Sequence, residues 1–388
     1  MPRLRFTVLF KVMLMAVLAV GLTVSCSRRH RITEYDEIHL GATSVGTKAL
    51  ITDKPTLIDL SYTNHTGFGV YGYKTILSRN YDYRQFNNVM VYPDANSTST
   101  TWSYSPKRYW DSDVEASYQF GAYWPYLDDE APQNGGPWVS ETGKVLTIND
   151  IPNWQEAASG TDYVVATRQG KYRDANPQIT PAFQGGIVDF SFGHILANVL
   201  VRAYYVGVQT NHVNVLSMQL SGDNMLTTGG NADYALPFSG EGTRGFVANS
   251  ITTGQGSHAL LPSTANPVTL DEATFCDESL QNPQYGYQDI CSWFVVPSTG
   301  WQGLTLNVNY SLGDITQSYT PAAIAATPVT GIALNTTVDE TTYSGTTLPQ
   351  YRYVITLKFN SASNGIEIES VKVADWKLVN IETGVYNW

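Results

Sequence analysis

The chain has 388 residues and a formal net charge of −11 at neutral pH, and such an acidic balance argues against nucleic acid or an anionic membrane surface as its partner. Charged residues make up 15% and aromatic residues 12%, with 25 Tyr and 9 Trp, a composition that favours half-buried β-strands. The length allows two domains of ordinary size.

The first 26 residues have the pattern of a secretory signal. Arg3 and Arg5 precede an apolar run, Val12–Val24, which is too short for a permanent membrane span, and Cys26 follows. We predict that cleavage leaves Cys26 at the new N-terminus as a lipid attachment point, so that acyl chains tether the protein to the membrane. Removing residues 1–25 takes away three basic side chains and no acidic one, which lowers the formal charge from −11 to −14. The alternative is an ordinary secreted protein with an incidental cysteine, and Thr23 stands where bacterial lipoboxes usually carry Leu.

The rest of the chain shows the period of two that is typical of β-strands. Apolar residues alternate most clearly over 304–312 and 351–359. Shorter runs of strand-favouring residues occur at 57–62, 69–77, 89–92, 118–123, 144–148, 163–167, 213–220, 292–296 and 365–373. The best helical candidate is 194–204, part of which could equally be a strand. Many short strands between turns predict an all-β protein of two antiparallel β-sandwiches. A polar stretch at Pro181–Gly186 places the boundary between residues 27–185 and residues 186–388.

Two further cysteines follow Cys26, namely Cys276 and Cys291. In an oxidising compartment an even pair can form one disulfide. Two buried free thiols are the alternative.

Patterns that would indicate an enzyme are weak. The acidic groups Asp111–Glu115 and Asp128–Glu130 could bind Ca²⁺ weakly, although solvated loops with this composition are far commoner. The six histidines form no zinc motif, and no phosphate-binding loop or nucleophile elbow occurs. We therefore predict a protein without enzymatic activity, cofactor or metal. A β-sandwich glycoside hydrolase is an alternative with little support in the sequence.

Four segments in order resemble the fimbrillin family, the lipoprotein-derived pilins of Gram-negative gut and oral bacteria. The first joins Trp102–Trp110 to Tyr118–Pro125, and the second is Val188–Ala197. The third comprises Phe294–Pro297, Leu304–Tyr310 and Tyr351–Leu357, and the fourth is Val373–Trp376. The resemblance covers nearly all of the mature chain.

This resemblance implies two transthyretin-like sandwiches and assembly by donor-strand exchange. The precursor is then a lipoprotein of the outer membrane and cell surface, held there by its lipid. A trypsin-like protease removes the lipid anchor and the first strand, and the emptied groove accepts a strand of the next subunit. The partners implied are other pilin subunits, the protease, and a ligand on a host or bacterial surface.

The resemblance also suggests where the protease cuts. The family usually carries a basic residue in a Thr-Lys/Arg-Ala context, and Thr47-Lys48-Ala49 matches it directly after a plausible removable strand at 38–45. Cleavage between Lys48 and Ala49 would free the mature pilin. Arg28, Arg29 and Arg31 are rival sites, and Lys48 could also be an ordinary surface lysine.

The C-terminal segment 377–388 is the candidate donor strand. Val379, Ile381, Thr383 and Val385 share one parity, which suits one inserted face. A final strand paired within its own domain is the alternative. A subunit with both groove and donor would be a shaft pilin, whereas one with a filled C-terminus would be a tip adhesin.

The predicted function is therefore a structural subunit of an adhesive fimbria, located on the cell surface. The alternative is a non-polymerising surface lipoprotein that binds glycans, since many Tyr and Trp residues would also suit sugar stacking.

Overall fold

The computed structural model describes residues 36–44, 67–93, 102–127, 135–240, 245–247, 250–262, 265–299, 301–313, 315–319, 336–338, 341–343, 347–362 and 365–375. These residues form strands, apart from loops and two short 3-10 turns, η1 (Leu77–Arg79) and η2 (Glu272–Thr274), so the all-β prediction is confirmed. No helix in this described part is both long and apolar enough to cross a membrane. The predicted strand at 57–62 lies outside the described residues.

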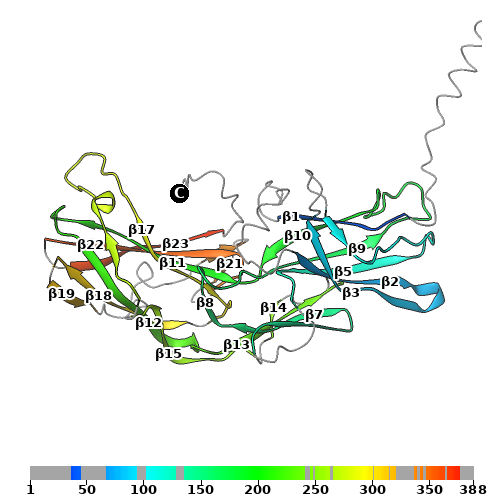
Figure 1. Cartoon of the computed structure of the whole chain (residues 1–388), viewed down its shortest axis with the longest axis horizontal. Helices are drawn as coiled ribbons and strands as arrows, with labels where there is room; N and C mark the ends of the chain where they lie inside the picture. The colour runs from blue at the N-terminus through cyan, green and yellow to red at the C-terminus, as the bar shows by residue number, and fades with distance from the viewer. Residues whose placement is uncertain are drawn as a thin grey trace, which may run out of the picture.

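One end of the elongated molecule is a seven-stranded sheet with the order β1-β10-β9-β5-β2-β3-β4 (Figure 1). Its strands are β1 (His39–Ser44), β2 (Phe68–Ile76), β3 (Tyr81–Pro93), β4 (Trp102–Tyr104), β5 (Ser117–Trp124), β9 (Val164–Lys171) and β10 (Ile187–His194). Neighbours are antiparallel except β1, which runs parallel to β10.

The remaining strands form two larger sheets and two smaller ones. The sheet β23-β22-β11-β17-β8 contains β8 (Trp154–Glu156), β11 (Ala197–Val206), β17 (Gln288–Val295), β22 (Tyr351–Asn360) and β23 (Gly365–Asp375). The sheet β15-β12-β18-β19, with β16 beside β12, contains β12 (Val213–Leu226), β15 (Thr253–Leu261), β16 (Val268–Leu270), β18 (Gln302–Leu312) and β19 (Ile315–Tyr319). The smaller sheets are β14-β13-β7-β6, from β6 (Trp138–Thr142), β7 (Val145–Pro152), β13 (Asn231–Pro237) and β14 (Gly245–Phe246), and the pair β20 (Thr336–Val338) and β21 (Thr341–Tyr343).

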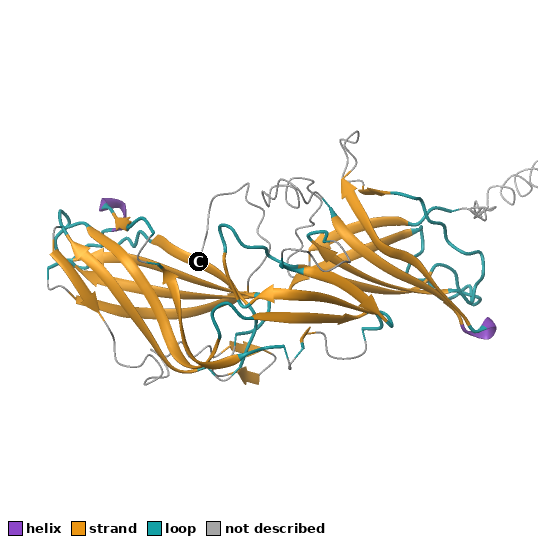
Figure 2. Ribbon diagram, turned by 60° about the horizontal axis from the view of Figure 1, so that its bottom comes forward, coloured by secondary structure: helices purple, strands orange, loops and turns teal. Residues whose placement is uncertain are grey.

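The predicted boundary near 185 lies between β9 and β10, yet strands from both sides of it share sheets. β7 pairs with β13, and β8 pairs with β17. Figure 2 shows strands following one another from one end of the molecule to the other.

The two main hydrophobic cores of the described residues follow from the alternation of the strands. The smaller core lies under the seven-stranded sheet and is rich in aromatic rings, among them Phe68, Phe86, Phe120 and Phe190. The larger core lies between the other sheets and takes the odd-numbered residues of β11 and β22. Since both faces of β11 are buried, the apolar run at 197–206 carries no clear period, and the helix considered there is a strand.

Candidate functional site

Strand β1 lies in a slot between two parts of the chain that are distant in sequence. On one side it pairs in parallel with β10, from His39 opposite Ile187 to Ser44 opposite Phe192. On the other side the residues just before it meet the segment 108–110 in antiparallel fashion. The Ile38 amide donates to the Arg108 carbonyl at 2.9 Å, and the Trp110 amide donates to the Asp36 carbonyl at 2.8 Å. The segment 36–44, which comprises these residues and β1, therefore closes a groove whose two walls are β10 and residues 108–110.

The inward side chains of this segment fill the groove. Ile38 is fully buried and Leu40 is 5% exposed, and both belong to the core of the seven-stranded sheet. His39, between them, points to solvent. The strand predicted at 38–45 is thus present in the described part, although the side chains beyond Gly41 are not described.

Two tyrosine hydroxyl groups and one lysine bind the segment 36–44 from positions next to the groove walls. The Tyr104 hydroxyl donates to the Ile38 carbonyl at 2.6 Å, and the Tyr172 hydroxyl donates to the Asp36 carboxylate at 2.8 Å. Burial raises the pKa of Tyr104 to about 12, and burial together with the Asp36 carboxylate raises the pKa of Tyr172 to about 12. Both hydroxyls therefore stay protonated donors at physiological pH. Lys107 adds an ion pair with Glu37 at 2.6 Å.

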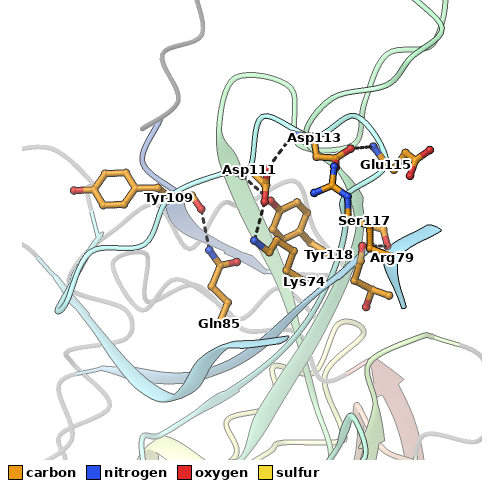
Figure 3. A network of polar contacts seen from close by, with 10 residues as sticks. Lys74, Arg79, Gln85, Tyr109, Asp111, Asp113, Glu115, Ser117 and Tyr118 are labelled. Carbon is orange, nitrogen blue, oxygen red and sulfur yellow. Dashed lines mark hydrogen bonds and ion pairs between the residues drawn. The ribbon is translucent and has the colours of Figure 1, made fainter. Parts of the chain in front are cut away.

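The wall formed by residues 108–116 is held from behind by side chains of the sheet (Figure 3). Lys74 of β2 pairs with Asp111 at 2.8 Å, and Arg79 of η1 pairs with Asp113 at 2.7 Å. The Asp111 amide donates to the Tyr118 hydroxyl at 2.8 Å. The Gln85 side-chain amide donates to the Tyr109 carbonyl at 2.8 Å.

None of these four contacts involves β1. The wall is anchored to β2, β3, β5 and η1, so the loss of β1 would leave these bonds in place. Its loss would empty the apolar pockets that Ile38 and Leu40 occupy. It would also leave backbone groups of β10 and of residues 108–110 without hydrogen-bond partners. Unpaired backbone groups beside an apolar groove favour the addition of a strand.

The acids considered for Ca²⁺ are part of this wall. Besides their lysine and arginine partners, the Asp111 and Asp113 carboxylates accept from the amides of Asp113 and Glu115, at 3.0 and 2.9 Å. Among the described residues no cluster of three acidic, histidine or cysteine side chains could hold a metal ion. Asp128–Glu130 lie outside the described residues.

The structure does not bring the two cysteines together. Both are free thiols. Cys291 of β17 packs against the large core on one face of the sheet, whereas Cys276 packs with Tyr204 and Val206 on the other face. Burial raises the pKa of the Cys291 thiol to about 12, which keeps it protonated.

The other predicted site residues lie outside the described residues. They are Cys26, Arg28, Arg29, Arg31, Lys48, Ala49 and the donor face Val379, Ile381, Thr383 and Val385. Sequence reasoning did not assign roles to Tyr104, Tyr172 and Lys107, the side chains that hold β1. Tyr104 lies within the aromatic motif at 102–110, which was the only signal available.

Comparison with known proteins agrees with this architecture. A family model described as fimbrillin-like matches residues 47–376. The crystal structure of a fimbrial protein from Bacteroides vulgatus ATCC 8482 is similar, with a TM-score of 0.50 and 16% identity over 88% of this chain and 99% of that chain. A protein from Bacteroides uniformis ATCC 8492 has a TM-score of 0.47 and 16% identity, covering 88% of this chain and 99% of that chain.

A more distant likeness is to the fimbrial anchor protein Mfa2 from Porphyromonas gingivalis, with a TM-score of 0.28 and 9% identity over 89% of this chain and 99% of that chain. No curated protein matches the chain. Because the fimbrillin-like model spans most of the sequence, the chain belongs to the fimbrillin-like family.

Proposed function

We propose that this protein is a structural subunit of a cell-surface fimbria, either in the shaft or at the tip, that serves adhesion and assembles by donor-strand exchange. The observation that carries the proposal is the position of the segment 36–44, in which β1 pairs with β10 and residues 36–38 pair with residues 108–110. Since β1 precedes Lys48, a cut after Lys48 would leave β1 bound only by non-covalent contacts. Cys26 lies on the same side of the cut, so cleavage would also release the predicted lipid anchor.

The emptied groove would favour a replacement strand. Each inward side chain of the size of Ile38 or Leu40 contributes about 1.5–3 kcal/mol on burial, and the strand also satisfies backbone groups on both walls. The contact runs from the groove of one subunit to the donor of the next. Such a head-to-tail contact does not close on itself, so the product is a fibre.

The C-terminal segment carries a pattern close to that of residues 38–42. Ile38, Gly41 and Ala42 have the same spacing as Ile381, Gly384 and Val385. In this register Ile381 would take the place of Ile38 and Thr383 that of Leu40. The donor would run parallel to β10, as β1 does.

The test begins with the chain from residue 27, purified and treated with limiting trypsin. We expect a new N-terminus at Ala49, followed by ladders that resist SDS and filaments in electron micrographs. Lys48→Gln removes that cleavage site and should abolish the ladders. A matched control is Lys372→Gln, an exposed lysine of β23, which should polymerise normally.

A cut chain that stays monomeric would contradict strand exchange between copies. A chain that resists trypsin as a stable monomer would instead favour the non-polymerising glycan-binding lipoprotein.

A further inference from the structure

A separate pocket of about 510 Å³ opens on the sheet β23-β22-β11-β17-β8. Among the described residues, its lining includes Leu200 and Arg202 of β11, Arg352 of β22, and residues of β17. Tyr353 and Ile355 belong to the large core, so their neighbours Arg352 and Thr356 lie on the opposite face of β22. The pocket is therefore on the face of the sheet that turns away from that core, and it shares no lining residue with the groove of β1.

Arg202 is fixed in place on this face. Its Nε donates to the Thr356 hydroxyl at 3.2 Å, and its guanidinium carbon lies 3.9 Å from the centre of the Tyr287 ring. The residue is only 8% exposed. These contacts use Nε and one planar face, so the two terminal amino groups are the parts that a ligand in the pocket can reach. A guanidinium already held in this way loses little freedom when it binds an anion.

A second guanidinium gives the pocket a local positive charge. Arg352 lines the pocket together with Arg202, and one carboxylate, Asp289, lies near both. Partial burial raises the pKa of Asp289, while the charges of Arg202 and Arg352 act in the opposite direction. Two guanidinium groups and one carboxylate thus line the pocket, on a chain whose formal charge is −11. An anionic ligand is therefore favoured here although the whole surface is acidic.

We propose that this pocket binds a sugar acid, that is, a pyranose ring bearing a carboxylate. The two arginines suit the carboxylate because a guanidinium can donate two parallel hydrogen bonds to it. The polar groups of Asp289, Ser292 and Gln288 suit ring hydroxyls, and Leu200 offers apolar surface to the C–H groups of a sugar.

The size of the pocket supports a ring rather than a smaller anion. Its volume lies within the roughly 300–1,000 Å³ of typical small-molecule sites, whereas a free phosphate or acetate would leave most of it empty. A fatty acid would leave the polar groups of β17 without partners. The site is independent of strand exchange, since it requires neither cleavage nor a second subunit.

The test uses the uncut chain from residue 27, titrated at low salt with sodium glucuronate, N-acetylneuraminate and glucose, with binding followed by calorimetry. We expect at least one acid to bind and glucose to bind at least about tenfold more weakly, because a lost charged hydrogen bond has that effect. The two acids distinguish a uronic from a nonulosonic sugar. Added salt should weaken the binding of the acid.

Arg352→Gln should weaken binding of the acid at least about tenfold. Arg352→Lys, which keeps the charge but loses the fork, should give a smaller loss and covers the case in which the glutamine variant does not fold. The matched control Lys372→Gln removes a cation from the same sheet outside the pocket and should bind normally. Equal affinity for glucose and glucuronate, no saturation by either acid, or unchanged affinity in a folded Arg352→Gln chain would each overturn the proposal.

Discussion

His258 shows how one buried side chain sets a pH limit on the fold. Its ring stacks on that of Trp154 with 4.2 Å between the ring centres, and it lies perpendicular to the ring of Trp293 with 4.4 Å between the centres. The residue is 6% exposed. Burial lowers its pKa from 6.5 to about 4. Between these two values the unfolded chain binds a proton that the folded chain does not.

The free energy of unfolding should therefore fall as the pH drops from about 6.5 towards 4. Above pH 6.5 the contribution of the neutral His258 to stability is fully present. A shift of this size corresponds to roughly 3 kcal/mol. Urea unfolding at pH 7 and pH 4.5 measures the loss for the uncut chain. Replacing His258 by Phe should reduce the difference between the two pH values by most of this amount.

The matched control is His212→Gln, which removes an exposed imidazole and so separates the buried site from the loss of a histidine in general. Protonation of carboxylates also lowers stability in acid, so the comparison between variants carries the argument. A His258→Phe chain with the same pH dependence as the parent would show that this imidazole does not set the limit.

At the scale of elements, β5 packs against the half of the chain beyond the predicted boundary, and the contact is made at a glycine of β5. A Cβ added at Gly121 would lie 2.1 Å from the ring of Phe238, which follows β13 and is fully buried. The strand must have glycine here because an aromatic ring from the other side of the predicted boundary packs directly onto its backbone.

Gly121→Ala should lower the free energy of unfolding by about 1–3 kcal/mol, the usual effect of overpacking in a core. Thermal or urea unfolding of the uncut chain measures it. Gly254→Ala on β15 is the control, since nothing lies within 4 Å of a Cβ added there. Equal stability of the two variants would mean that the β5–Phe238 contact tolerates extra volume and does not fix the two halves together.

Strands whose apolar residues alternate in the sequence were predictable because that alternation is local. The predicted 118–123, 304–312 and 351–359 agree closely with β5, β18 and β22. β15 was not predicted, since its run Thr253–Ser257 is polar and carries two glycines. β11 was ambiguous because burial on both faces removes the period of two.

The candidate groove was predictable only in part. The inward positions of the first strand follow from its own alternation, so Ile38 could be anticipated. The parallel pairing of β1 with β10, and the hydroxyl of Tyr104 on the Ile38 carbonyl, join residues far apart in the chain. No local pattern encodes such contacts, because they depend on how the whole sheet closes.

At the scale of the whole molecule, polymerisation should depend on one emptied groove in each cut subunit. A peptide with the sequence of the donor strand should then compete with the next subunit for that groove. We expect an excess of the peptide 376–388, added before trypsin, to convert SDS-resistant ladders into capped monomers on gels.

Whether the peptide caps the subunit depends on which of its side chains point into the groove. In the proposed register Ile381 enters the pocket of the buried Ile38, while Glu382 takes the outward position of the exposed His39. A peptide with Ile381→Asp should fail to cap, because a carboxylate would be buried in an apolar pocket without a partner. A peptide with Glu382→Gln should cap as well as the parent. If both peptides cap equally, the donor does not insert with this face, and if the parent peptide does not cap while ladders form, a different segment is the donor.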